Sequence, residues 1–514
     1  MNIKAILASL LLLPTAAQAQ PLRPQVDAWR RAHEREILDE AFALFAIPNV
    51  ASNQDDIAKN VAFLTQAFAK RGVALTTLRA PSGGSPALFG ELRVPGATRT
   101  VVFYAHYDGQ PVAGGGWDAD PFVPELRRYK NSVAQEAAPL PAKGDTIDPE
   151  LRIRARSASD DKGPIIAMLA ALDAMKAAKR SATVNVKFFL EGEEEAGSNH
   201  LGELLKTYKN QLTADAWLFF DGPTHVSGRP QLVLGVRGVM GADITFYGAN
   251  RALHSGHYGN WAPNPAVLAA QFVASIRDVD GRIRIANFYD DVPAISASDK
   301  QLAAALSVSD DSVRTSLGLA HTEANNAPLG ERIMYPALNV RGIRAGNVGT
   351  GAANAVPTSA SVSLDFRLVP NQQPARIKQL LEAHLASLGY TVTRDVNAAA
   401  KSTDRSKLVS ITWDEGYTSV RVASTLAPVQ AVKRLMTSAY GVEPFTMPIL
   451  GGSLPLFHFV EQLGATVITV PTVNADNSQH APNENLCVRN LWDAIAVMAE
   501  LMTGLGKEWP GALR

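Results

Sequence analysis

Three short apolar runs, each followed by polar or charged residues, constrain the fold most. Residues 100–105, 184–190 and 216–220 have the composition of strands, and segments with helical periodicity such as residues 165–178 lie between them. Strands whose apolar runs are largely unbroken are typical of sheets buried on both faces. The alternation therefore predicts an α/β fold with a mostly parallel sheet and flanking helices.

The pattern changes near residue 235. Apolar and polar side chains alternate in residues 239–247 and 361–368, as they do in half-exposed antiparallel strands. The first pattern returns after about residue 400. We therefore expect a discontinuous α/β domain interrupted by an inserted α+β domain, with boundaries at residues 20–234, 235–400 and 401–514. Residues 131–150, enriched in Pro and Ala, are expected to form a loop.

Residues 1–19 have the features of a secretory signal peptide. A positively charged start precedes the apolar residues 5–13, and residues 17–19 read Ala-Gln-Ala, a typical cleavage site. The apolar stretch is too short to span a membrane, and no other run is long and apolar enough. Cys487 is the single cysteine, which excludes an internal disulfide. We expect a periplasmic or secreted protein.

Charge composition bears on the possible partners. The chain of 514 residues has 49 Lys plus Arg and 49 Asp plus Glu, so its formal net charge is zero. A nucleic-acid-binding protein or a protein of a membrane surface usually carries a basic excess. The composition therefore argues against both classes.

Side chains that suit metal ions follow the strand ends. His106 and Asp108 follow the first strand, and Asp221 follows the third. The second strand ends in a run of carboxylates, Glu191 and residues 193–195, whose mutual repulsion calls for a cation. Sites in open α/β sheets lie beyond the carboxyl ends of the strands. The glutamate run alone is more often a solvated acidic face, and Asp221 alone could be a turn or helix cap, but together with His106 and Asp108 they predict a metal centre.

Two further segments complete the set. Asp160 and Asp161 lie just before the helix predicted at residues 165–178, and His480 ends the loop that follows a strand at 466–470. The chain thus offers two histidines and several carboxylates. Since one divalent ion needs about four ligands, this set can hold two ions that share a bridging carboxylate.

These segments form motifs that occur together in one family. In chain order they are FYAHYDGQPV, WDADPF, RSASDDKGP, LEGEEEAGS, LHSGHYG, DFRLVPNQ, GGSLPLF and SQHAPNENL. The chain resembles the co-catalytic dinuclear zinc exopeptidases, which include carboxypeptidase G, aminoacylase, succinyl-diaminopimelate desuccinylase and carnosinase-type dipeptidases. It looks most similar to the carnosinase and non-specific dipeptidase branch. The resemblance implies a zinc-exopeptidase fold whose inserted domain is a sandwich that serves as lid and dimerisation surface.

The resemblance also implies roles at the metal centre. Two zinc ions per chain would be held by His106, Asp160, Glu195, Asp221 and His480. Asp108 would orient His106, and Asp160 would bridge the ions, with a cis peptide bond between Asp160 and Asp161. Glu194 would be the general base, unless the roles in the glutamate run are shifted by one residue. Mn²⁺ and Co²⁺ accept the same types of ligand.

The substrate-binding groups come from the same comparison. His254 would stabilise the oxyanion, often from a partner subunit, and Arg367 would hold a terminal carboxylate through its planar guanidinium group. Further contacts would come from Asn354, Gly452 and Ser453. The resemblance also implies a homodimer formed through the inserted domain.

The resulting functional hypothesis is metal-dependent hydrolysis of an amide bond near a free C-terminal carboxylate by a dipeptidase or carboxypeptidase. An N-acyl-amino-acid amidohydrolase would use the same site, so this alternative stays open. A periplasmic metal- or peptide-binding protein without catalysis is disfavoured, since a binder has no need of a base such as Glu194 beside the metal ions.

Overall fold

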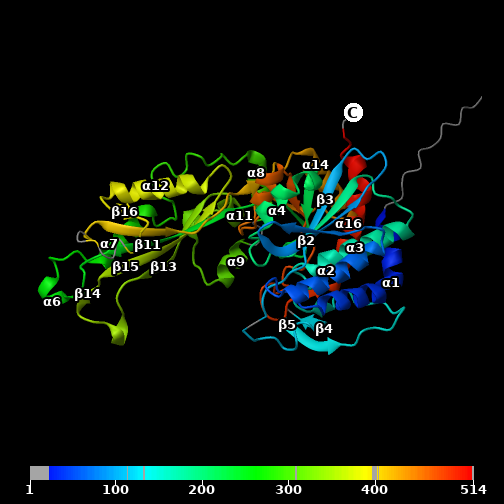
Figure 1. The fold of residues 1–514 in the computed structure, drawn as a ribbon, viewed down its shortest axis with the longest axis horizontal. Helices are drawn as coiled ribbons and strands as arrows, with labels where there is room; N and C mark the ends of the chain where they lie inside the picture. Colours follow the sequence, from blue (N-terminus) through cyan, green and yellow to red (C-terminus); the bar gives the residue numbers. More distant parts are fainter. Residues whose placement is uncertain are drawn as a thin grey trace, which may run out of the picture.

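The computed structural model describes residues 22–511 apart from 113, 131–132, 307–309, 396, 398–401 and 403–404. Two sheets of unequal size lie side by side, and the chain passes from the larger to the smaller and back (Figure 1). The signal peptide predicted at residues 1–19 lies outside the described residues. Among the helices that are described, none combines the length and apolar composition needed to cross a membrane.

The larger sheet has the strand order β1-β2-β7-β3-β8-β20-β9-β19. Its strands are β1 (Thr76–Ala80), β2 (Gly83–Leu92), β3 (Thr100–His106), β7 (Asn185–Glu191), β8 (Ala216–Phe219), β9 (Gln231–Val233), β19 (Phe445–Met447) and β20 (Val467–Thr469). The central strands β7, β3, β8 and β20 are parallel to one another, whereas β1 and β2 run antiparallel at one edge. The predicted α/β fold with a mostly parallel sheet is confirmed.

Helices cover both faces of this sheet. One face packs on α1 (Leu22–Phe45), α2 (Gln54–Ala69), α3 (Lys162–Ala177), α14 (Ala427–Tyr440) and α16 (Val488–Glu508), and the other packs on α4 (Leu201–Thr207) and α15 (Phe457–Leu463). Neighbouring residues of one strand therefore enter different cores: Phe103 faces the first set of helices and Tyr104 the second. Burial on both faces explains why these strands are apolar throughout.

The smaller sheet has the order β13-β15-β11-β17-β16. Its strands are β11 (Gly238–Tyr247), β13 (Ala337–Arg344), β15 (Ser359–Leu368), β16 (Thr391–Thr393) and β17 (Leu408–Trp413). Every second residue of β15 is buried, and the buried face packs on α7 (Pro265–Ile276) and α12 (Pro374–Ser387). Because β17 pairs with β11, this unit extends to Trp413, beyond the boundary predicted at residue 400.

The two units are joined by a short ribbon and by a helical segment. β10 (Gly235–Val236) pairs with β18 (Val420–Arg421) where the chain leaves and re-enters the larger unit. The segment consists of α8 (Ala297–Leu306), α9 (Asp310–Ser316), α10 (Glu323–Asn326) and α11 (Leu329–Ile333), none of which was predicted. Ala303 and Met334 from this region pack against Ile449 of the larger unit.

A further, four-stranded sheet flanks the loop that carries Asp160. Its order is β21-β6-β4-β5, with β4 (Glu125–Lys130), β5 (Val133–Ala138), β6 (Arg152–Arg154) and β21 (Asn485–Cys487). The expectation of a loop over residues 131–150 is therefore wrong for residues 133–138, because backbone pairing with β4 makes a strand of a weakly patterned sequence. The pairing of β6 with β21 brings residues near 154 and 485 together.

Candidate metal centre

The predicted metal ligands meet at the carboxyl ends of the parallel strands. His106 is the last residue of β3, Asp221 lies two residues after β8, and Glu195 lies in the loop after β7. Asp160 and Asp161 precede α3, and the peptide bond between them is cis, as the resemblance implied. Convergence at this edge follows from the parallel arrangement of the strands.

Distances within the cluster are short. The His106 Nε2 atom lies 2.9 Å from one carboxylate oxygen of Asp160, and the His480 Nε2 atom lies 3.1 Å from the other. His480 also lies 3.3 Å from Glu195. One potential ligand atom from each of His106, Asp160 and Glu195 lies within 4.8 Å of the other two. Asp160 therefore sits between two imidazoles with one oxygen facing each.

Electrostatics show that the cluster needs positive charge. Burial raises the pKa of the Glu194 carboxyl well above its usual value, raises that of Glu195 to about 8 and raises that of Asp221 to about 6. Neighbouring carboxylates add to the effect in each case. A divalent cation among these groups stabilises their ionised forms. Histidine nitrogens and carboxylate oxygens are a donor set that suits Zn²⁺, so the residues present fit such an ion.

Asp108 contacts both the histidine and the acidic loop. The backbone carbonyl oxygen of Asp108 lies 3.2 Å from His106 Nδ1, while its carboxylate lies 3.5 Å from that atom. The carboxylate instead accepts hydrogen bonds from the backbone N–H groups of Glu194 and Glu195, each at 3.0 Å. Asp108 thus fixes the loop that carries the predicted base and a predicted ligand, a contact that the H-x-D spacing did not predict.

The cavity beside the cluster leads to the groups expected to bind a carboxylate. It has a volume of about 310 Å³, and its lining includes Glu194, Asp221, Tyr417 and Ser453. The Arg367 guanidinium donates to the Ser453 hydroxyl at 3.1 Å. Gly452 adjoins Ser453, and its carbonyl accepts a hydrogen bond from another backbone N–H group. The cavity therefore extends from the cluster to Ser453, whose hydroxyl contacts a guanidinium on the smaller sheet.

His254 and Asn354 do not join this assembly. His254 pairs with Ala355 in the ribbon β12 (Leu253–His254) and β14 (Ala355–Val356), directly beside Asn354. Both side chains are exposed, and the His254 ring contacts the tilted ring of His257 with 4.5 Å between centroids. β14 and α6 (Ser255–Tyr258) lie at the end of the smaller sheet that is remote from the larger sheet (Figure 1). Neither residue lines the cavity of its own chain.

Several residues of the site were not predicted. Gln110 donates to Glu195 at 2.7 Å, Gln479 lies 3.3 Å from Asp160, and Tyr417 lines the cavity. Gln110 lies four residues after His106, and Gln479 directly precedes His480. Their closeness in the sequence to predicted ligands could have indicated a role in the site. Tyr417 lies in a polar segment between the units, and no sequence pattern pointed to it.

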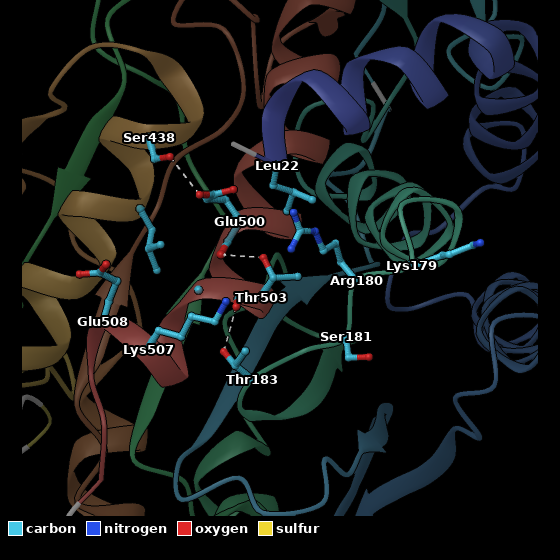
Figure 2. A pocket seen from close by; sticks show the side chains of 12 residues that line it. Leu22, Lys179, Arg180, Ser181, Thr183, Ser438, Glu500, Thr503, Lys507 and Glu508 are labelled. Carbon is cyan, nitrogen blue, oxygen red and sulfur yellow. Dashed lines mark hydrogen bonds between the residues drawn. The ribbon is translucent and has the colours of Figure 1, made fainter. Parts of the chain in front are cut away.

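A second cavity, of about 490 Å³, contains none of these groups. It is lined by residues from α14, from α16 and from the segment after α3, including Thr183, Ser438 and Glu500 (Figure 2). Thr183 precedes β7, whereas the metal-type residues follow that strand. The larger cavity therefore lies at the opposite end of the strand, away from the candidate chemistry.

Comparison with known proteins agrees with the geometry. The model of peptidase family M20/M25/M40 matches residues 102–504. A Cys-Gly metallodipeptidase of Saccharomyces cerevisiae is 26% identical over 409 residues, which cover 78% of each chain. A β-Ala-His dipeptidase of Homo sapiens is 25% identical over 419 residues, covering 80% of this chain and 75% of that protein.

A solved structure extends the likeness to the fold. An M20 family metallo-carboxypeptidase from Sulfolobus solfataricus superposes with a TM-score of 0.71 at 28% identity, covering 91% of this chain and 99% of that one. The predicted periplasmic or secreted location is wrong, because the matched relatives are mostly cytosolic enzymes. Since the family model covers most of the sequence, the chain belongs to peptidase family M20/M25/M40 and is a metallopeptidase.

Proposed function

We propose that this protein is a metal-dependent dipeptidase that cleaves the peptide bond next to a free C-terminal carboxylate. One observation carries the proposal: a single cavity is lined both by Asp160 and Glu195 of the cluster and by Ser453, whose hydroxyl accepts a hydrogen bond from Arg367. Dipeptidase activity is also named for the two curated relatives. The alternative is a carboxypeptidase that acts on longer peptides. It would require space beside the cluster for the N-terminal part of the substrate.

Two divalent ions, by default Zn²⁺, are proposed as the cofactor. Their ligands would be His106, Asp160, Glu195, Asp221 and His480. The placement of Asp160 between two imidazoles supports its role as the shared ligand. When bound, such ions lower the pKa of water and polarise the scissile carbonyl.

The protein's own groups then bind the substrate and move protons. Arg367 and Ser453, with the Gly452 backbone, would hold the terminal carboxylate and so place the scissile bond at the cluster. Glu194 would accept a proton from the attacking water and deliver it to the leaving amine. Glu194 is partly buried in the cavity wall, which would limit the contact of this transfer with bulk water.

We further propose a homodimer formed through the smaller unit, residues 235–400 with its extension to Trp413, which would act as lid. His254 and Asn354 lie exposed and outside the cavity of their own chain, so a second copy is the natural source of these groups for the site. In this arrangement His254 would stabilise negative charge on the carbonyl oxygen of the substrate held by the other chain.

Mixed dimers test this arrangement. His254→Ala and Glu194→Gln chains carrying different tags are co-expressed, and the heterodimer is isolated by two affinity steps. Each homodimeric variant is expected to be nearly inactive, whereas the heterodimer has one intact site of two and should regain about half of the wild-type activity. A heterodimer as inactive as its parents would show that His254 does not act across the dimer.

Metal content and substrate range test the function itself. We expect about two zinc ions per chain by elemental analysis, cleavage of dipeptides with a free carboxylate, and loss of turnover after chelator treatment that added Zn²⁺ restores. Matched dipeptide amides should be poor substrates, because they lack the anion that Arg367 binds. Cleavage of N-acyl-amino acids alone would assign the protein as a deacylase, and turnover without metal would overturn the proposal.

A further inference from the structure

Glu484 is a buried carboxylate beside the metal centre that is not among its proposed ligands. Its side chain is fully buried, and it lies four residues after His480 and directly before β21. The pairing of β21 with β6 places it under the loop that links β6 to α3 and carries Asp160. A buried carboxylate is costly unless other groups satisfy its charge.

The Asp160 loop supplies the partners of this carboxylate. One oxygen of Glu484 accepts hydrogen bonds from Ser159 N, Ser159 Oγ and Asp160 N, at 3.0, 2.8 and 2.9 Å. The other accepts from Ser157 N at 2.9 Å and from the Arg156 guanidinium at 2.8 Å. A single side chain thus satisfies three backbone N–H groups of a loop that has no regular secondary structure of its own.

The same residue connects two distant segments of the chain. The backbone carbonyl of Glu484 accepts a hydrogen bond from Ala155 N, so both its main chain and its side chain contact the loop. His480 on one segment and Asp160 on the other face each other at 3.1 Å. Loss of the Glu484 contacts would release the loop that carries Asp160 from the segment that carries His480.

We propose that Glu484 is a positioning residue that holds Asp160 and His480 in the arrangement required to bind metal. The inference rests on the proposed function, because it assumes that these two residues are ligands. Glu484 itself touches neither metal nor substrate. It acts by fixing the backbone N–H groups of Ser157, Ser159 and Asp160. The Asp160 carboxylate then points toward the two imidazoles before an ion binds.

Glu125 provides a matched control. Its carboxylate accepts a hydrogen bond from the buried Arg154 at 2.7 Å and also pairs with Arg127. Glu125 lies on β4, in the four-stranded sheet that also contains β21. Its ion pair with Arg154 is of the same type as that of Glu484 with Arg156. Unlike Glu484, it has no contact with the loop of residues 157–160 among its described hydrogen bonds.

The experiment measures Co²⁺ binding to chelator-treated protein by its visible absorption spectrum. Glu484→Gln keeps the size of the side chain but places an amide N–H₂ among the loop donors. We expect it to weaken Co²⁺ binding about 10- to 100-fold and to change the absorption spectrum. Glu125→Gln should leave both unchanged. Melting temperatures of the metal-free proteins, compared across both variants, separate this effect from a general loss of stability.

Each outcome decides the matter. Unchanged Co²⁺ affinity and spectrum in Glu484→Gln would overturn the proposal, as would an equal loss in Glu125→Gln. If Glu484→Gln does not fold, Arg156→Met, which removes one donor and leaves the backbone contacts, is expected to weaken binding about threefold or more, and unchanged affinity would overturn the proposal. Failure of the wild-type protein to bind Co²⁺ would instead refute the metal centre itself.

Discussion

Replacing Glu194 with glutamine is expected to lower kcat by about three orders of magnitude while leaving the metal content unchanged. Glu194 lines the cavity and is surrounded by the cluster, and glutamine has the same shape but cannot accept a proton. Because the proposed ligands remain, the loss should appear in kcat and not in metal binding. Steady-state kinetics and elemental analysis of the purified variant provide the two measurements.

Glu193 is the matched control for this substitution. It adjoins Glu194 in the acidic run, but its carboxylate lies 2.8 Å from the His200 ring and does not line the cavity. Glu193→Gln should therefore keep a kcat close to that of the wild type. A large loss in Glu193→Gln with little change in Glu194→Gln would show that the role of the base belongs to the preceding residue.

Replacing Asp160 with asparagine is expected to remove metal from the protein and to lower kcat at least about 10³-fold. Asp160 faces His106 with one oxygen and His480 with the other, so its charge is shared by both sides of the cluster. An amide keeps the volume but loses the charge and one acceptor. Elemental analysis should find fewer than two ions per chain, and excess Zn²⁺ should restore little activity.

Asp161 shows whether this effect is specific. Its carboxylate accepts a hydrogen bond from His106 N at 3.2 Å, which an asparagine oxygen can also accept. Burial, followed by the nearby charge of Asp221, raises the pKa of the Asp161 carboxyl well above its usual value. Asp161→Asn should therefore retain its metal. Equal metal loss in both variants would mean that the cluster depends on the local fold and not on the Asp160 charge.

The larger sheet was predictable because its strands are buried on both faces. Residues such as Phe103 and Tyr104 enter two different cores, which leaves an apolar run in the sequence. The metal-type side chains were predictable for a related reason, since parallel strands bring their carboxyl ends to one edge. The motifs then assigned these residues to a family, and that assignment is confirmed.

Other features depend on contacts between distant segments. β5 has a weak apolar pattern and becomes a strand only through its pairing with β4, and β17 completes the smaller sheet after a polar stretch. Glu484 was not singled out in the sequence, and it is buried where β21 pairs with β6. The distance of His254 from the cavity likewise requires the three-dimensional arrangement of the smaller unit.

The spread of the proposed ligands along the chain has a consequence for maturation. His106 and His480 lie far apart in the sequence, and the His480 loop follows β20, which pairs with β8 in the larger sheet. No short stretch holds enough ligands for a tight site. Assembly of the complete set of proposed ligands therefore requires synthesis of nearly the whole polypeptide, so a chain truncated before His480 should bind less metal than the full-length protein.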